Sequence, residues 1–127
     1  MSREPSPELD ALATRVIGAA IKVHRALGPG HLESAYEKAL CIELRKQGIK
    51  CVAQHPFTVY YENEPVAESR ADVLVEDQLL LELKSVEQFA AIHPAKALAY
   101  LKGLNLHLGL LINFNVQYHD LSIVLHI

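Results

Sequence analysis

The sequence has only two cysteines, no apolar run of membrane-spanning length, and no excess of positive charge. Neither Cys41 nor Cys51 has a partner at the spacing of a zinc site or a redox motif, and we expect a reducing compartment. No apolar run approaches the roughly 18 residues that a membrane span needs. We therefore expect a cytoplasmic protein without a membrane contact.

The net charge of −3 at pH 7 gives no overall attraction to a phosphate backbone. Any contact with nucleic acid must therefore depend on a local basic patch. The seven histidines show no pairing that is typical of metal sites, and we expect them to be structural or solvated.

The length and composition predict one domain over residues 1–127. With 127 residues and 50% hydrophobic content, the chain can bury one core and not two. The stretch from Met1 to Pro7 is rich in proline and serine, and we expect it to be disordered.

Helical periodicity occurs in three segments. Apolar residues recur every three or four positions from Leu9 to Leu27, and Gly28-Pro29-Gly30 ends this helix. A second helix is predicted from His31 to Gln47, so that the first two form an αα-hairpin. A third helix is predicted to open at His93-Pro94 and to end at Gly103.

The remaining apolar segments have the composition of short strands. They are Cys51–Ala53, Phe57–Tyr61, Ala71–Val75, Leu79–Leu83, Leu108–Phe114 and Leu121–Leu125. The turns between them are predicted at Asn63-Glu64-Pro65 and Glu76-Asp77-Gln78. Because the run from Leu108 to Ile112 does not alternate, it predicts a central strand buried on both faces. The order predicts an α/β fold with a mixed central sheet and helices on both faces.

Charged side chains share one face of two neighbouring strands. Strand alternation places Arg70, Asp72 and Leu74 on one face, opposite Ala71 and Val73. In the next strand, the same rule places Glu82 and Lys84 on one face with Leu80.

This charged set has two interpretations. It can be a solvated face with weak cross-strand ion pairs. It also has the chemistry of a hard-cation site, because two carboxylates and the carbonyl of Leu83 are oxygen ligands that suit Mg²⁺. Lys84 could then position a water or offset charge on a phosphate.

Strand parity decides whether the two carboxylates can meet. Pairing Val75 with Leu79 across a three-residue loop places Asp72 opposite Glu82, close enough to share one cation. A two-residue turn at Asp77-Gln78 would place Glu82 on the opposite face.

Several separated motifs resemble the GxxExxY protein family. Gly30-x-x-Glu33-x-x-Tyr36 matches the motif that names it, and the other similar segments follow in the order of that family over Leu9 to Phe114. These segments are Arg70-Ala-Asp72, Glu82-Leu-Lys84, Ile92-His93, Tyr100-Leu101-Lys102 and Leu110-Leu111-Ile112-Asn113-Phe114.

The resemblance implies a PD-(D/E)XK (restriction-endonuclease-like) core with metal-dependent phosphodiester chemistry. Asp72, Glu82 and the Leu83 carbonyl would then hold Mg²⁺ or Mn²⁺, with Lys84 at the attacking water and Glu33 as an assisting carboxylate. The alternative for Glu33 is a first-turn residue that the helix dipole favours.

One position departs from the family pattern. Related sequences carry a glutamine four residues before the tyrosine of the third helix, where this chain has Lys96 before Tyr100. An ammonium group there would repel a metal ion and attract a nucleic-acid backbone, and Lys96 can also be plain surface. We predict Arg70, Lys96 and Tyr100 as substrate contacts.

Two functions follow from these residues. The first is a Mg²⁺-dependent nuclease or nuclease-like phosphodiesterase that acts on nucleic acid. The second is a binding module that keeps the fold but cuts nothing, as a homodimer or as the partner of another protein.

Overall fold

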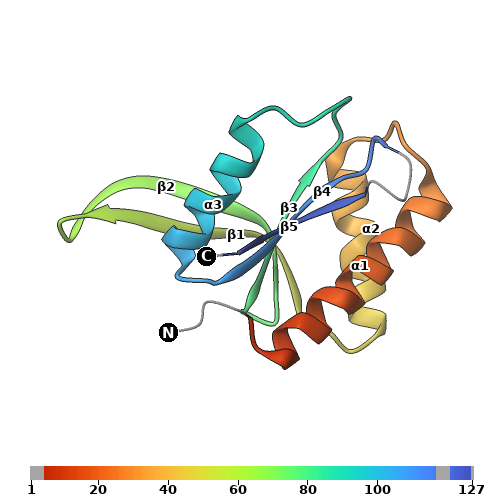
Figure 1. The fold of residues 1–127 in the computed structure, drawn as a ribbon, viewed down its shortest axis with the longest axis horizontal. Coiled ribbons are helices and arrows are strands. Elements are labelled where there is room, and N and C mark those ends of the chain that lie inside the picture. The colour runs from red at the N-terminus through yellow and green to blue at the C-terminus, as the bar shows by residue number, and fades with distance from the viewer. Residues whose placement is uncertain (1–4, 117–120, 127) are drawn as a thin grey trace.

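The described part of the chain forms three helices around a five-stranded sheet (Figure 1). The computed structural model describes residues 5–116 and 121–126. Its elements in chain order are α1 (Pro7–Leu27), α2 (Glu33–Lys46), β1 (Cys51–Tyr61), β2 (Glu64–Val75), β3 (Leu79–Lys84), α3 (Ile92–Leu104), β4 (Leu108–Asn113) and β5 (Ser122–His126). The predicted α/β class with an N-terminal αα-hairpin is confirmed.

The sheet is mixed, as predicted, with the strand order β1-β2-β3-β4-β5. The pairs β1–β2, β2–β3 and β4–β5 are antiparallel, whereas β3 and β4 run parallel. A parallel pair needs a crossover, and α3 supplies it. The hairpin of β1 and β2 extends away from the body of the molecule, and its residues 60–68 are exposed (Figure 1).

Helices cover both faces of the sheet. The larger apolar cluster joins α1 and α2 to one face, where Val73, Leu81 and Ile112 are fully buried. A smaller cluster around Leu80 and Leu101 joins α3 to the other face. The sheet centre is therefore dry on both sides, as the unbroken apolar run of β4 predicts.

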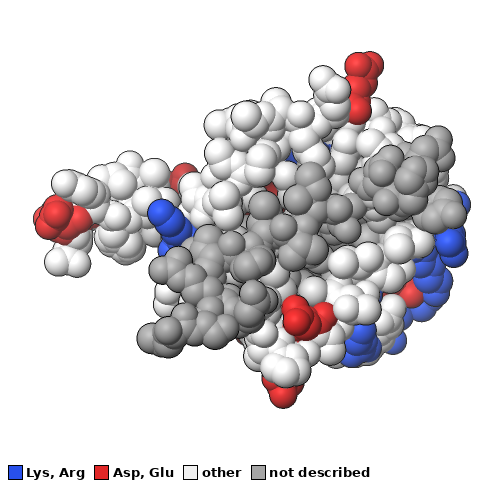
Figure 2. Space-filling view, in the orientation of Figure 1, with Lys and Arg blue, Asp and Glu red and all other residues white. Residues whose placement is uncertain are grey.

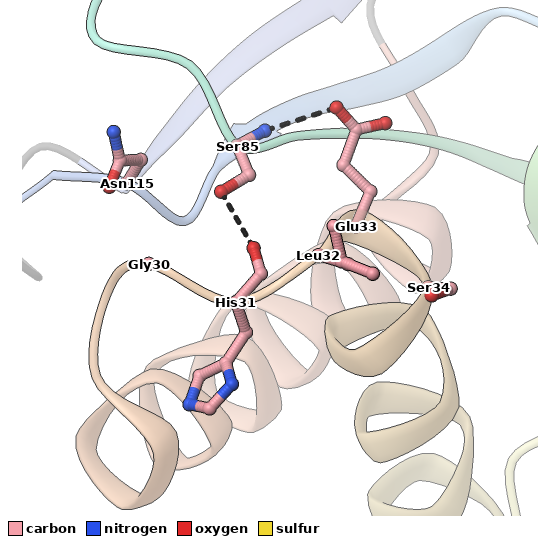
Figure 3. A pocket seen from close by; sticks show the side chains of 7 residues that line it. All are labelled: Gly30, His31, Leu32, Glu33, Ser34, Ser85 and Asn115. Atoms are coloured by element: carbon pink, nitrogen blue, oxygen red, sulfur yellow. Dashed lines mark hydrogen bonds between the residues drawn. The ribbon is translucent and has the colours of Figure 1, made fainter.

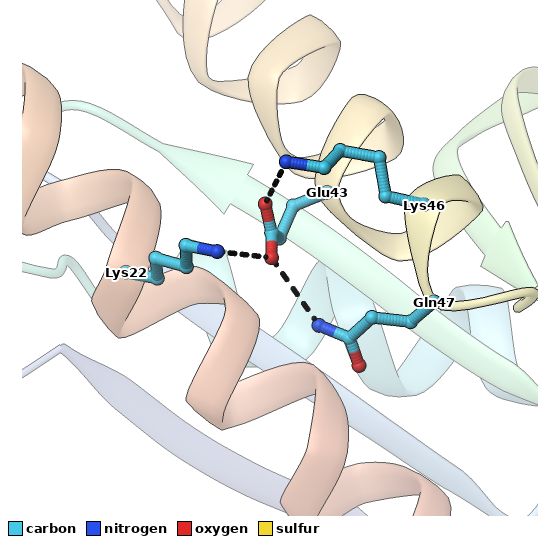
Figure 4. A network of polar contacts seen from close by, with 4 residues as sticks. All are labelled: Lys22, Glu43, Lys46 and Gln47. Carbon is cyan, nitrogen blue, oxygen red and sulfur yellow. Dashed lines mark hydrogen bonds and ion pairs between the residues drawn. The ribbon is translucent and has the colours of Figure 1, made fainter.

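Ion pairs connect the two N-terminal helices at the surface. The Lys22 ammonium lies 2.9 Å from the Glu43 carboxylate, which also contacts Lys46 at 3.9 Å and Gln47 at 3.4 Å (Figure 4). Both lysine side chains are more than 60% exposed, so this network adds little to stability.

The helix starts differ from the prediction at both α1 and α2. Ser6 caps α1, because its hydroxyl accepts a hydrogen bond from the Leu9 amide at 3.1 Å, and Pro7 is the first helical residue. Residues 6 and 7 are thus ordered, whereas residues 1–4 of the predicted loose stretch lie outside the described residues. The second helix begins at Glu33 because Gly28 and Gly30 have positive φ values of 71° and 102°.

The strand prediction needs one correction in the first hairpin. The segments Cys51–Ala53 and Phe57–Tyr61 belong to one strand, and Tyr61 pairs with Glu64. The turn is therefore Glu62-Asn63, with φ values of 50° and 65° at the two positions. Positive φ at both central residues matches the right-handed twist of the flanking strands.

The two cysteines are paired with each other, although their spacing is not that of a zinc site or a redox motif. Cys41 in α2 and Cys51 in β1 form a disulfide with a Cα–Cα distance of 5.6 Å. Gly48, with a φ of 77°, reverses the chain between them and brings the strand back against the helix. Their sequence separation of 10 matches no common motif. The contact between them depends on the chain reversal at Gly48 and not on local spacing.

Among the described residues, no helix is long and apolar enough to cross a membrane.

Candidate active site

The hairpin of β2 and β3 sets the position of the two predicted ligands. Val75 pairs with Leu79, and Val73 pairs with Leu81, which is the register that a three-residue loop predicts. Continuing this register by one residue places Asp72 opposite Glu82, directly after the last pair of the β2–β3 ladder. The predicted three-residue loop at 76–78 is confirmed.

Glu82 is a buried carboxyl group, with only 4% of the residue exposed. Its Oε1 atom is buried and has no hydrogen-bond partner among the described residues. Burial first, and then the hydrogen bond and negative charge of Asp72, raise the pKa of Glu82 to about 9, against a smaller opposing effect of Lys84 and Lys96. Without a cation, Glu82 is therefore protonated at neutral pH.

Asp72 is half-buried and holds the neighbouring strand. Its Oδ2 atom accepts a hydrogen bond from the Leu83 amide at 2.8 Å. The strand alternation predicted around it is only partly correct, because Ala71 packs in the α3 cluster whereas Val73 packs against α1 and α2. The irregularity coincides with Gln54 of β1, which has a φ of 55°. Gln54 lies across from Asp72, and these two residues are not paired in the β1–β2 ladder.

The three predicted cationic residues occupy different positions. Lys84 ends β3 and is half-buried, and its charge opposes the pKa rise of Glu82. Lys96 is exposed on α3, and its charge also acts on Glu82. Arg70 is exposed on β2, opposite Pro56 of β1.

Lys96 is also in contact with an aromatic ring. Its ammonium lies 5.5 Å from the centroid of Tyr100, which packs edge-on against Phe57 at 5.1 Å. Such a cation–π contact stabilises the Lys96 ammonium, and Tyr100 packs in the cluster between α3 and the sheet. Lys96 and Tyr100 therefore lie on the side of the sheet where Glu82 lies.

Glu33 reaches the exit of β3. Its Oε2 atom accepts a hydrogen bond from the Ser85 amide at 3.3 Å, one residue after Lys84 (Figure 3). The Ser85 hydroxyl donates to the carbonyl of His31 at 3.0 Å, so Ser85 donates both hydrogen bonds to the start of α2 and the loop before it. These groups and Asn115 line an open pocket of about 610 Å³.

Tyr36, the last residue of the GxxExxY motif, has a structural role. Its ring is fully buried and stacks on Phe114 with centroids 4.4 Å apart. The hydroxyl donates to the Gly28 carbonyl at 2.5 Å and accepts from the His31 amide at 3.1 Å. The tyrosine therefore fixes the loop between α1 and α2, and with it the start of the helix that carries Glu33.

Asn113 was not predicted as a site residue from the sequence. Its side chain is buried at the end of β4 and forms hydrogen bonds with Val86 beyond β3. The available signal was a lone polar residue in the run from Leu108 to Phe114, which is otherwise apolar or glycine.

The acidic pair fits a hard divalent cation. Mg²⁺ is often held by one or two carboxylates and keeps several waters, and the buried Oε1 of Glu82 is a ligand atom without another partner in the described structure. Within residues 5–116 and 121–126, no group of three or more His, Cys, Asp or Glu side chains could hold a metal. The donor set therefore suits Mg²⁺ or Mn²⁺ and not a closed zinc site.

Residues 10–124 match the family model described as the PD-(D/E)XK nuclease superfamily. The match spans most of the chain, and the protein belongs to this superfamily. No curated protein and no solved structure matches the chain.

Proposed function

We propose that the protein is a Mg²⁺- or Mn²⁺-dependent nuclease or nuclease-like phosphodiesterase that acts on nucleic acid. The observation that carries this proposal is the pair of adjacent carboxyl groups of Asp72 and Glu82, one of them buried with an unpartnered oxygen, in a chain of the PD-(D/E)XK superfamily. The finer placement in the GxxExxY family rests on the motif at Gly30, Glu33 and Tyr36.

The roles of the site residues follow from their chemistry. A divalent ion supplies a coordinated water of lowered pKa and polarises a phosphoryl oxygen. Asp72 and Glu82 are the carboxylate ligands in this proposal, and the Leu83 carbonyl is the third. Lys84 offsets the charge that develops on the phosphate, and Glu33 assists from the exit of β3.

Two substrate contacts are proposed on the α3 side of the sheet. Lys96 attracts the phosphate backbone there, and Tyr100 holds the Lys96 ammonium. Arg70 is proposed as a separate contact from the opposite face, because its neighbour Ala71 packs in the α3 cluster. In the view of Figure 2, most of the visible Lys and Arg side chains gather at the end of the molecule formed by α1 and α2. With a net charge of −3, binding of nucleic acid depends on a local basic patch, and we propose a substrate in the cytoplasm.

A catalytically silent module is the second candidate. Lys84 and Lys96 both act on Glu82 with a positive charge, and they can replace part of the charge that a metal would bring. Such a protein would keep the fold and act as a homodimer or bind another protein.

Cleavage assays on labelled single- and double-stranded DNA and RNA test the proposal. We expect cleavage that needs Mg²⁺ or Mn²⁺ and is lost in Asp72→Ala, Glu82→Ala and Lys84→Ala. Glu64→Ala is the matched control, because this carboxylate is exposed at the far end of β2. Cleavage in the presence of a chelator, or wild-type rates from Glu82→Ala, would contradict the assignment.

A further inference from the structure

Three polar side chains are buried among the described residues, and only one of them belongs to the acidic pair. They are His24, Glu82 and Asn113. His24 forms a hydrogen bond with the Phe114 carbonyl at 2.9 Å. Asn113 is 2% exposed and lies directly before Phe114. Both side chains therefore act at the end of β4.

Asn113 holds the backbone of a single residue beyond β3 by both of its polar groups. The side-chain Nδ2 donates to the Val86 carbonyl at 2.8 Å, and Oδ1 accepts from the Val86 amide at 3.1 Å. Oδ1 also accepts from the Asn115 amide at 3.1 Å. One amide group thus connects the end of β4 to the segment that leaves β3.

The position of Asn113 in the sheet brings it next to the acidic site. In the parallel register, Asn113 pairs with Lys84. Gly109 lies against Leu101 of α3, so alternate residues of β4 from Gly109 to Asn113 face α3. Leu80 packs on this same side, and strand alternation places Lys84 there too.

The segment after β3 is held at three consecutive residues. The Lys84 carbonyl accepts from the Phe114 amide at 2.9 Å. The Ser85 amide donates to Glu33, and Val86 is held by Asn113. A long lysine side chain has many rotamers, so fixing its backbone on both sides narrows where the ammonium can lie relative to Glu82.

An apolar side chain would suit the core at position 113 better. All six residues of β4 are buried, and a buried amide is unfavourable unless its hydrogen bonds are made. The hydrogen bonds of Asn113 go to the exit of β3 and to Asn115, not to a side chain of the core. The amide is therefore explained by what it does to the exit segment.

We propose that Asn113 is a positioning residue of the acidic site, which holds Val86 and thereby keeps Lys84 beside Asp72 and Glu82. The inference rests on the proposed function of that site. It predicts that the site loses order when the amide is removed even though the fold survives.

Asn113→Leu is the test variant, because it keeps the shape branched at Cγ and removes all three side-chain hydrogen bonds. Asn113→Ala is the second variant in case leucine does not pack. Gln78→Ala is the control for loss of an amide, since Gln78 is exposed in the turn between β2 and β3 and takes no part in this hold. Circular dichroism and cooperative unfolding establish that each variant is folded.

Two readouts separate positioning from a loss of overall stability. Amide hydrogen exchange should become at least about tenfold faster at Ser85 and Leu83 than in wild type, with little change at Leu110 in the same sheet. The kcat for Mn²⁺-dependent cleavage should fall about 10- to 100-fold with KM within about twofold, as for residues that orient ligands of a metal site. The control should match wild type in both.

The outcomes distinguish the inference from the proposed function. If wild type neither binds Mn²⁺ nor cleaves nucleic acid, the proposed function fails, and hydrogen exchange alone decides whether Asn113 orders the exit of β3. Unchanged exchange at Leu83 and Ser85 in the folded Asn113→Leu protein would overturn the inference. With an active wild type, an unchanged kcat would overturn it as well.

Discussion

Asp72 and Glu82 lie opposite each other in the register of the β2–β3 hairpin, and the carboxylate of Asp72 helps to raise the pKa of Glu82. Ionising both carboxyl groups is unfavourable without a compensating charge, because Glu82 is buried and Asp72 is half-buried beside it. A proton on Glu82 satisfies this requirement, and a divalent cation would satisfy it in another way. The predictions below depend on this exchange of a proton for a cation.

Glu82→Gln should stabilise the protein in alkaline solution. The folded-state pKa of about 9 lies above the ordinary value of 4.5, so the stabilisation from the bound proton is complete below about pH 4.5 and is lost as pH rises through about 9. Wild type should therefore lose up to about 4 kcal/mol relative to the glutamine variant between pH 6 and pH 9.

Urea unfolding of both proteins at the two pH values measures this difference. Glu87→Gln is the control, because Glu87 is an exposed carboxylate shortly after β3. A wild type and a Glu82→Gln variant that lose stability in parallel would show that Glu82 has an ordinary pKa.

Binding of a divalent ion should release a proton. A ligand carboxylate must be ionised, and the pKa of Glu82 is raised to about 9 without the ion. At pH 7 we expect release of about one proton per bound Mn²⁺, and an affinity that rises up to about tenfold per pH unit below pH 9. Calorimetric titration in buffers of different ionisation enthalpy counts the protons. Identical heats in all buffers would mean that the ion does not displace a proton from Glu82.

Lys96→Gln should bind divalent ions a few-fold more tightly. The Lys96 charge acts on Glu82 in the same direction as a metal ion, and removing it removes a repulsion. Lys102→Gln, an exposed lysine in the last turn of the same helix, is the control for net charge. Equal affinities for the two variants would mean that Lys96 is a surface residue without an effect on the cation site. A lower affinity in Lys96→Gln would mean that Lys96 favours ion binding, opposite to the proposed effect.

Reduction of the Cys41–Cys51 disulfide should lower the free energy of unfolding by about 2–3 kcal/mol. This value follows from the entropy of closing a loop with a sequence separation of 10. Thermal unfolding with and without dithiothreitol measures it, and the Cys41→Ala/Cys51→Ala protein should not respond to the reductant. If wild type is also insensitive, the two cysteines are not paired in solution.

The secondary structure could be predicted where the apolar periodicity agrees with the positions of residues that end helices and strands. Gly28 and Gly30 mark the end of α1, and the unbroken apolar run of β4 predicts its burial on both faces. The join between Cys51–Ala53 and Phe57–Tyr61 could not be predicted, because Pro56 and Gln54 break the pattern while the strand continues. Edge strands tolerate such residues.

The candidate site was predictable as far as local rules extend. Parity and loop length predict the register that sets Asp72 opposite Glu82. The bond from Glu33 to Ser85 and the hold of Asn113 on Val86 join residues 52 and 27 positions apart, and no local rule reports such pairs. The same limit hides the burial of Glu82, which depends on how α3 covers the sheet.

Calorimetric titration of Mg²⁺ and Mn²⁺ into wild type, Asp72→Asn and Asp77→Asn tests the cation site most directly. Asparagine preserves the shape of Asp72 and removes one ligand charge, and Asp77 is the control because it is an exposed carboxylate in the turn of the same hairpin. We predict binding at one site in wild type and in Asp77→Asn, and a loss of at least about tenfold in affinity in Asp72→Asn. Equal binding by all three proteins, or no binding by any of them, would contradict a metal site at Asp72 and Glu82.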